Sequence, residues 1–217
     1  MGNGINHSMR LYLVRHGQTA WNLEGRAQGQ TDIPLDEVGL RQAEAVGRAF
    51  RDIPLDRVLT SDLSRAYATA GAISPRAERR ADLRERSFGE WEGSPFTRVA
   101  ERSIEMSLVE GCHSLEVRPP KGESFADVWR RLDTVVAEIG ESEGRLAIVS
   151  HGGTCAVLLA RLVRGTLETS RGFRFGNTGV TELERRADGY FVIVRYNDVS
   201  HLAAERPLAG SVDGTHR

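Results

Sequence analysis

The sequence predicts an α/β fold of three layers, with a mainly parallel sheet, helices on both faces and an antiparallel hairpin at one edge. Short apolar runs of β type alternate with segments of helical periodicity through most of the chain, as in βαβ units. Near the end, two alternating strands at 180–183 and 190–196 are joined by Ala187-Asp188-Gly189, which is a hairpin signal. The first pattern indicates the parallel sheet, and the second indicates its antiparallel edge.

The first half of the chain opens with a predicted strand. Residues 9–15 (MRLYLVR) form an apolar run that stops abruptly at His16-Gly17. A helix is predicted over 36–50, because its apolar side chains recur at helical spacing. Those side chains are Leu40, Ala43, Val46 and Phe50. The elements expected after it are a strand at 58–61, a helix at 63–72, an irregular strand at 77–83 and a poorly patterned helix at 94–109.

The second half contains the clearest helix. Residues 124–139 carry one apolar stripe, and Gly140 is expected to end the helix. The stripe comprises Phe125, Val128, Leu132, Val135 and Ile139. A buried strand follows at 145–150 (RLAIVS) and again stops at a histidine–glycine pair, and an apolar helix is expected behind it at 154–163.

Composition excludes several classes of protein. The 217 residues carry a net charge of −1, so no global electrostatic footprint points to nucleic acid or to an acidic membrane. No apolar run approaches the ~20 residues that a membrane span needs. Two cysteines, Cys112 and Cys155, are too few for a disulfide framework and suit a reducing cytosol. The sequence therefore predicts a cytoplasmic protein without nucleic-acid or membrane partners.

The chain reads as a single domain over 9–205. Residues 1–8 (MGNGINHS) are expected to be a loose N-terminal extension, and 206–217 a C-terminal tail. The pattern is weakest over 94–121, which we interpret as an insertion that sets substrate specificity. An exposed edge at the terminal hairpin could support a homodimer.

Charged and polar side chains gather where the predicted strands end. In an open α/β sheet, ligands bind beyond the carboxyl ends of the strands. The topology sends two imidazoles, two guanidiniums and one carboxylate toward this edge, namely His16, His151, Arg15, Arg65 and Glu85. This set predicts a phosphoryl-transfer site, because arginines bind the charged oxygens while a neutral imidazole can attack phosphorus.

The run from Leu13 to Asn22 (LVRHGQTAWN) resembles the opening signature of the histidine phosphatase superfamily, which includes the cofactor-dependent phosphoglycerate mutases. Four further stretches follow in the family's order: SDLSRA at 61–66, LRERSFGEWEG at 83–93, GES at 122–124 and SHGG at 150–153. Residues 196–202 (YNDVSHL) resemble the terminal strand of the phosphatase branch. The resemblance covers residues 9–202 and implies a phosphoglycerate mutase-like fold.

The resemblance also implies roles for individual residues. The implied catalytic residues are His16 as the nucleophile that becomes phosphohistidine, Glu85 as general acid/base, and His151, Arg15 and Arg65 around the phosphoryl group. The implied substrate-binding residues are Arg15, Asn22, Gln28, Arg65 and Gly152. We further expect a protonated His151 when phosphate is bound, and a helix N-terminus near Gly153 that offers free amides to the anion. Metal-ligand spacing is absent, so neither a metal nor a cofactor is expected.

Two alternatives concern the general acid. Glu85 lies among five arginines in the sequence, so it could instead belong to a solvated face of ion pairs. Glu90 and Glu92 are its rivals for the acid role. The carboxylate position in the family motif favours Glu85.

Three functions follow from the resemblance. We favour a metal-independent phosphomonoesterase acting on a small phosphorylated metabolite. A cofactor-dependent phosphoglycerate mutase is the first alternative, but the basic insertion typical of that branch is missing, and Glu90 and Glu92 near the mouth would repel a second phosphate. A catalytically silent binder of phosphorylated ligands is the second, although neither His16 nor Glu85 is missing. Phe96, Met106, Leu108 and Val109 are expected to form a partly apolar wall.

Overall fold

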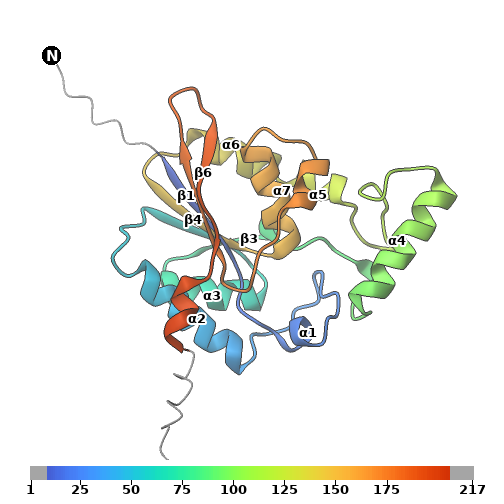
Figure 1. Ribbon diagram of the computed structural model, residues 1–217, viewed down its shortest axis with the longest axis horizontal. Coiled ribbons are helices and arrows are strands. Elements are labelled where there is room, and N and C mark those ends of the chain that lie inside the picture. Colours follow the sequence, from blue (N-terminus) through green and yellow to red (C-terminus); the bar gives the residue numbers. More distant parts are fainter. Residues whose placement is uncertain (1–8, 206–217) are drawn as a thin grey trace, which may run out of the picture.

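The computed structural model describes residues 9–205, so the expected extension at 1–8 and tail at 206–217 lie outside the described residues. Six strands form one sheet in the order β3-β2-β4-β1-β5-β6. β1 to β4 pair in parallel, while β5 is antiparallel to both β1 and β6. Helices cover both faces of this sheet (Figure 1). The predicted three-layer α/β fold with an antiparallel edge is confirmed.

The bounds of the elements lie close to the expected ones. The strands are β1 (Arg10–Arg15), β2 (Arg57–Ser61), β3 (Glu78–Arg80), β4 (Arg145–Ser150), β5 (Val180–Arg185) and β6 (Phe191–Asp198). The α-helices are α1 (Ala20–Leu23), α2 (Glu37–Phe50), α3 (Ser64–Ile73), α4 (Phe96–Glu110), α5 (Phe125–Arg131), α6 (Asp133–Glu141) and α7 (Gly152–Leu162). Short 3₁₀ helices are η1 (Ala81–Leu83), η2 (Gly89–Trp91), η3 (Glu168–Gly172) and η4 (Ser200–Glu205).

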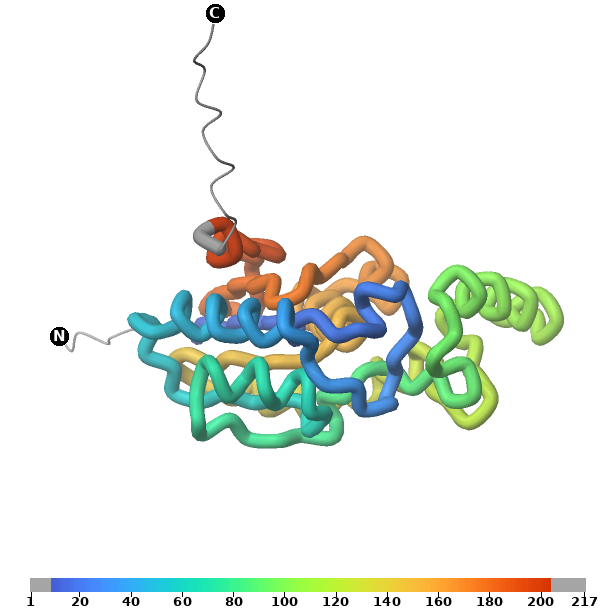
Figure 2. Tube along the Cα trace, turned by 90° about the horizontal axis from the view of Figure 1, so that it is seen from below, coloured from blue at the N-terminus to red at the C-terminus, as the bar shows by residue number. Residues whose placement is uncertain are grey.

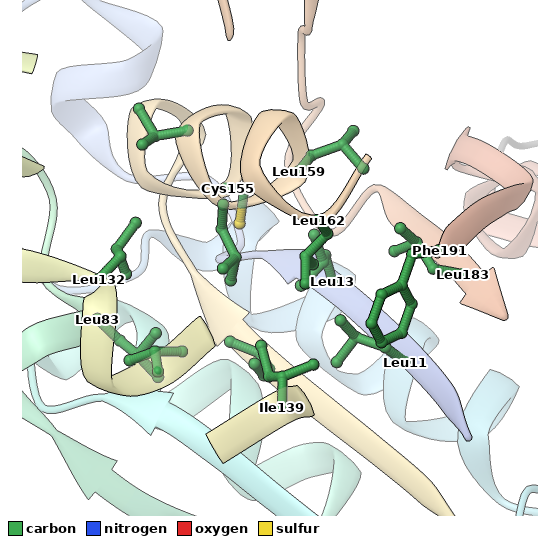
Figure 3. Packing of buried hydrophobic residues seen from close by; sticks show 14 of the residues in the cluster. Leu11, Leu13, Leu83, Leu132, Ile139, Cys155, Leu159, Leu162, Leu183 and Phe191 are labelled. Atoms are coloured by element: carbon green, nitrogen blue, oxygen red, sulfur yellow. The ribbon is translucent and has the colours of Figure 1, made fainter. Parts of the chain in front are cut away.

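The central strand β1 is apolar on both sides because each face of the sheet is covered. Leu11 and Leu13 pack in a core with α5, α6 and α7, which Figure 3 shows in close view. Tyr12 and Val14, which alternate with them, pack in a second core with α2 and α3. Successive side chains of a strand point to opposite faces, so a strand buried on both faces is an unbroken apolar run.

The register of the parallel strands sets the position of the site. Arg15 at the end of β1 lies opposite Ser150 at the end of β4. Thr60, next to the end of β2, lies opposite Val149. The same edge of the sheet therefore carries Ser61, the last residue of β2, and His16 and His151, which directly follow β1 and β4.

Some expectations about the helices were wrong in detail. The helix expected over 124–139 is divided at Leu132, which has φ −82° and ψ 1°, into α5 and α6. The stripe remains continuous, since Val128, Leu132, Val135 and Ile139 are all fully buried in one core, and this is why the periodicity did not reveal the break. Gly140 does not end the helix, because α6 continues to Glu141.

Two further differences concern single elements. Leu40 was expected on the buried face of α2, but 51% of its surface is exposed. The buried face of α2 is formed by Gly39, Ala43, Ala45, Val46 and Phe50. The irregular strand expected at 77–83 is the three-residue β3 followed by the 3₁₀ turn η1.

The helix α4 projects beyond the end of the sheet that carries the site (Figure 2). The strand β6 is the last in the strand order and forms one edge of the sheet, where Ile193 and Val194 are partly exposed. A homodimer through this edge stays a prediction. Within residues 9–205, no helix combines the length and apolar character needed to cross a bilayer.

Candidate active site

A cavity of about 750 Å³ lies at the carboxyl edge of the parallel strands. All eight residues singled out from the sequence line it: Arg15, His16, Asn22, Gln28, Arg65, Glu85, His151 and Gly152. Its volume falls within the range of sites for small molecules, roughly 300–1,000 Å³. The structure thus brings the candidate residues together, although Arg15 and Gly152 are 137 residues apart in sequence.

His16 follows β1 directly and is buried. Its Nδ1 lies 2.6 Å from the carbonyl oxygen of Gly17, which can only accept, so Nδ1 carries the proton and donates. Burial, together with the nearby charges of Arg65 and Arg15, holds the pKa of His16 well below its ordinary value. The imidazole is therefore neutral, and Nε2 keeps a free lone pair.

Gly17 allows the chain after β1 to pass close to the first turn of α2. A Cβ at this position would lie 2.6 Å from the carbonyl oxygen of Gly39. The amide of Gly17 donates to Oγ1 of Thr69 on α3, at 3.0 Å. These contacts fix the backbone that orients the His16 ring.

His151 lies beside His16, with their ring centroids 5.0 Å apart. Nδ1 of His151 accepts a hydrogen bond from Nε of Arg65 at 3.2 Å. Its Nε2, 2.9 Å from Oγ of Ser61, then carries the proton and donates. Burial and the charge of Arg65 hold the pKa of His151 well below its usual value. In this geometry His151 is neutral, and its protonation on binding phosphate stays a prediction.

Arg65 is 1% exposed, although it stands at the start of α3. Its Nη1 donates to the carbonyl of Thr31 and its Nη2 to the carbonyl of Gly29, at 3.0 and 2.7 Å. Burial lowers the pKa of Arg65 to about 10, so the guanidinium stays charged at neutral pH. The loop between α1 and α2 thus fixes a buried cation beside both histidines.

Arg15 and Asn22 keep donors available for an anion. Nη1 of Arg15 donates to the carbonyl of Phe175 at 2.7 Å, while its buried Nε has no partner among the described residues. Oδ1 of Asn22 accepts from Thr19 and from Nδ2 of Asn177. The side-chain amide of Asn22 is thereby oriented with its Nδ2 left to donate.

Glu85 is held by the N-terminus of α7. Its carboxylate accepts from the amides of Gly153 and Thr154 at 2.9 and 3.1 Å, and from the amide of Arg86 at 2.9 Å. Within residues 9–205 it forms no ion pair, so the hypothesis of a solvated face of ion pairs is wrong. The expectation that the amides near Gly153 are free for the anion is also wrong for Gly153 and Thr154, because the carboxylate occupies them.

The two rival carboxylates have other roles. Glu90 forms an exposed ion pair with Lys121 at 2.9 Å. Glu92 accepts from the amides of Gln30 and Thr31, both at 2.9 Å, and so supports the loop that holds Arg65. Neither residue lines the cavity, so the expectation that they repel a second phosphate at its mouth is not supported.

The outer wall of the cavity is apolar. It includes Phe96, Val99, Ala100 and Ile104 from α4, and Phe88, Leu115, Phe125, Phe173 and Phe175 from elsewhere. The predicted contribution of Phe96 is thus seen. Leu108 and Val109 were expected in this wall, but they are 79% and 87% exposed and do not line the cavity. Met106 packs instead against a small core that contains Trp91.

Several residues of the site were not predicted from the sequence. Nδ2 of Asn177 donates to the carbonyl of His16 at 3.1 Å, and the amide of Thr178 donates to the carbonyl of Arg15 at 3.0 Å. Thr178 adopts a φ of 54°, which is rare for a β-branched residue and common at functional sites. The only available signal was the turn-like run Gly176-Asn177-Thr178-Gly179 before a strand. Arg86 was also missed.

A family model for the histidine phosphatase superfamily (branch 1) matches residues 11–199. The chain belongs to this superfamily. The neutral His16, the two arginines and Glu85 lie in the segments that carried the resemblance, LVRHGQTAWN, SDLSRA and LRERSFGEWEG.

Individual histidine phosphatases are similar over nearly their whole length. The Yersinia pestis (strain Pestoides F) protein named "Probable phosphoglycerate mutase GpmB" is 30% identical in an alignment 212 residues long, which covers 89% of this chain and 95% of that protein. The structure of the alpha-ribazole phosphatase from Shigella flexneri is 28% identical with a TM-score of 0.76, covering 88% of this chain and 96% of that chain. Mycobacterial glucosyl-3-phosphoglycerate phosphatase is 28% identical with a TM-score of 0.75, covering 88% and 99%.

These histidine phosphatases differ in their named activities. Two of the solved relatives are phosphatases, with different substrates in their names, while the curated relative is named as a mutase. Membership therefore supports phosphatase or mutase activity for this chain, and the choice between them depends on its own residues.

Proposed function

We propose that this chain is a metal-independent phosphomonoesterase that hydrolyses a small phosphorylated metabolite through a phosphohistidine on His16. The observation that carries the proposal is the neutral His16, whose Nε2 is unprotonated in a cavity where Nε of Arg15 has no partner within residues 9–205. A nucleophile and an uncompensated donor at one edge of the sheet suit attack on a phosphoryl group.

In the first step, Nε2 of His16 attacks phosphorus and the bond from phosphorus to the alcohol oxygen breaks. The guanidiniums of Arg15 and Arg65 stabilise the charge on the equatorial oxygens. Glu85, protonated, delivers its proton to the departing alcohol oxygen. The products of this step are the free alcohol, the phosphohistidine and the Glu85 carboxylate.

In the second step, the Glu85 carboxylate takes a proton from water as the water oxygen attacks phosphorus. The bond between phosphorus and Nε2 breaks, and inorganic phosphate leaves. His16 and protonated Glu85 are restored. The amides of Gly153 and Thr154 support this double role, because they hold the carboxylate in one place during both proton transfers.

The mutase alternative keeps the same first step and transfers the phosphoryl group to another hydroxyl instead of water. The name of the curated relative favours it. The two phosphatase structures favour hydrolysis, as does the missing basic insertion after Glu85. Incubation with 3-phosphoglycerate and catalytic 2,3-bisphosphoglycerate distinguishes them, since a mutase yields 2-phosphoglycerate and a phosphatase yields free phosphate.

The experiment that tests the proposal is to trap the intermediate from a ³²P-labelled phosphomonoester by rapid denaturation. We expect an acid-labile, base-stable label on the wild type, and neither label nor turnover in His16→Ala. His113→Ala is the control, because His113 is exposed and does not line the cavity. A label on serine, or an active His16→Ala variant, overturns the assignment. Saturable binding of the phosphomonoester by the wild type with neither label nor turnover would instead favour the silent binder.

A further inference from the structure

The strand β6 carries a β-bulge close to its end. The register between β5 and β6 shifts at Thr181 of β5, and two residues of β6, Tyr196 and Asn197, lie opposite it. Asn197 has a φ of 48°, and its amide donates to Oγ1 of Thr181 at 3.0 Å. A positive φ is uncommon outside glycine, and bulges that re-aim a side chain are frequent next to active sites. The direction of the Asn197 side chain is therefore specified by the fold.

The side chain of Asn197 contacts the turn before β5, which we define as residues 175–179. Its Oδ1 accepts a hydrogen bond from the amide of Gly176 at 2.8 Å. The turn is closed by a hydrogen bond from the amide of Gly179 to the carbonyl of Gly176 at 2.9 Å. A Cβ at Gly179 would overlap Oδ1 of Asn197, so only glycine leaves room for the side-chain amide there.

The same turn holds two residues of the candidate active site. The carbonyl of Phe175 accepts from Nη1 of Arg15 at 2.7 Å, and the amide of Thr178 donates to the backbone carbonyl of Arg15 at 3.0 Å. Nδ2 of Asn177 donates to the carbonyl of His16 at 3.1 Å. One turn thus positions both the proposed nucleophile and a guanidinium that faces the phosphoryl group in the proposed mechanism.

The proposed general acid is held by a different part of the chain. Glu85 accepts from the amides of Gly153 and Thr154 at the start of α7, and from the amide of Arg86. A displacement of the 175–179 turn would therefore alter the attack on phosphorus and leave proton delivery to the leaving oxygen in place.

We propose that Asn197 is a positioning residue for phosphoryl transfer, an inference that rests on the proposed function. By accepting from the amide of Gly176, it keeps the 175–179 turn, and through the turn Arg15 and His16, in the geometry for attack. Asn197 does not line the cavity, so it acts through the turn and not on the substrate. The bulge of β6 thereby connects the edge of the sheet to the end of β1, two strands away.

Asn197→Gly is the main test, because glycine keeps the positive φ and removes the acceptor. We expect kcat/KM to fall by roughly 10-fold, equally for an alkyl phosphate and for p-nitrophenyl phosphate. The contact between Oγ1 of Thr178 and Nε2 of His201, at 3.1 Å, remains in this variant and limits the displacement of the turn. Asn197→Asp, which keeps an acceptor oxygen, should restore kcat/KM close to the wild-type value.

The second measurement is the dissociation constant of orthovanadate, determined by calorimetry. Vanadate adopts the five-coordinate geometry of a phosphoryl group under attack, so its affinity reports on the positions of Arg15 and His16. We expect this constant to rise by roughly 10-fold in Asn197→Gly and to return in Asn197→Asp. A variant that only lost folded protein would show a lower kcat, with KM and the vanadate constant unchanged.

Arg195→Met is the matched control on the same strand. It removes the ion pairs of Arg195 with Glu182 and Asp198, neither of which belongs to the turn, and should leave the vanadate constant unchanged. Gly179→Ala, whose Cβ displaces Oδ1 of Asn197, should reproduce the losses of Asn197→Gly. It is judged by the same two measurements and decides the outcome if Asn197→Gly does not fold.

Three results overturn the inference: wild-type affinity for vanadate in Asn197→Gly, a loss in kcat/KM that depends on the leaving group, or no recovery in Asn197→Asp. A wild type that binds no vanadate overturns it as well. If the wild type binds vanadate but hydrolyses neither ester, the proposed function fails, whereas the vanadate constants of the variants still decide the role of Asn197.

Discussion

The amide of Gly153 donates a hydrogen bond to Oε2 of Glu85 at 2.9 Å. This contact joins the proposed general acid to the first turn of α7, which begins directly after His151. The N-terminus of a helix attracts anions because its first amides lack partners within the helix. In this chain those amides bind the carboxylate of Glu85. The position of Glu85 relative to His151 thus depends on the backbone of α7.

Gly153→Ala should displace the general acid. A Cβ at Gly153 would lie 2.7 Å from Oε1 of Glu85, so the carboxylate must move. We expect kcat/KM for an alkyl phosphate to fall by about 10-fold or more, and that for p-nitrophenyl phosphate to fall less, since p-nitrophenolate leaves without a proton. Gly71→Ala in α3 is the control, because its Cβ would meet nothing within 4 Å. Equal, small losses for both substrates would show that the contact does not position the acid.

Much of this site could be predicted because its residues follow strand ends. His16 and His151 come directly after buried apolar runs, and the parallel register that aligns those ends follows from the βαβ pattern. The partners of Glu85 could not be predicted in the same way. Free amides of a helix suit any anion, and the sequence does not say whether a carboxylate or a phosphate binds them.

Arg86 shows a second limit of prediction from the sequence. In the sequence it is one of many arginines, and composition makes another surface charge the default interpretation. Its burial depends on Phe88 and Phe125, which come from separate segments and stack on it only in the folded chain. Among residues 9–205 no carboxylate forms an ion pair with Arg86, since Glu123 pairs with Arg131 instead, and only the packed structure shows this.

Acidification should destabilise the fold through the buried histidines. The folded-state pKa of His16 lies well below its ordinary value, whereas an unfolded histidine titrates near 6.5. Below about pH 6.5 the unfolded chain therefore binds more protons, and the free energy of unfolding falls by up to ~1.4 kcal/mol per pH unit for each such histidine. Above that pH this contribution is constant.

Urea unfolding of the wild type and of His16→Asn between pH 4.5 and 7.5 isolates this contribution. The contributions of the other titrating groups cancel in the difference between the two free energies of unfolding. The difference should change with pH only below about 6.5, to the disadvantage of the wild type. Gly71→Ala, which changes no titrating group and whose Cβ would meet nothing within 4 Å, should show a constant difference. A constant difference for His16→Asn as well would contradict a neutral, buried nucleophile.

Activity should survive excess EDTA. In the proposed mechanism, the positive charge that the phosphoryl group needs comes from the side chains of Arg15 and Arg65, both of which lie in the wall of the cavity. We therefore expect kcat and KM for p-nitrophenyl phosphate to be unchanged after prolonged chelation and desalting. Loss of turnover that Mg²⁺ or Zn²⁺ restores would contradict the metal-independent mechanism.

The last prediction separates the roles of Glu85 and its rivals. A general acid matters in proportion to how much the leaving oxygen needs a proton, and general acid catalysis is typically worth about 10²–10⁴-fold. An alkoxide from a sugar or a hydroxy acid leaves poorly, whereas p-nitrophenolate leaves unaided. Glu85→Gln keeps the size of the side chain and removes the transferable proton. It should lower kcat/KM for alkyl phosphates by roughly 10²-fold or more, and much less for p-nitrophenyl phosphate.

The comparison uses kcat/KM because, in the proposed mechanism, Glu85 also activates water in the second step. Slower loss of the phosphohistidine would then lower kcat for every substrate alike. Glu90→Gln is the control, since Glu90 forms an exposed pair with Lys121 outside the cavity and the change should leave kcat/KM for both substrates unaffected.

Glu92→Gln should lower kcat/KM for both substrates to the same degree, because its contacts support the loop around Arg65 and do not involve the leaving group. Only loss of the acid makes the damage depend on the leaving group. If Glu85→Gln costs both substrates little and equally while Glu92→Gln shows the leaving-group dependence, the acid is Glu92.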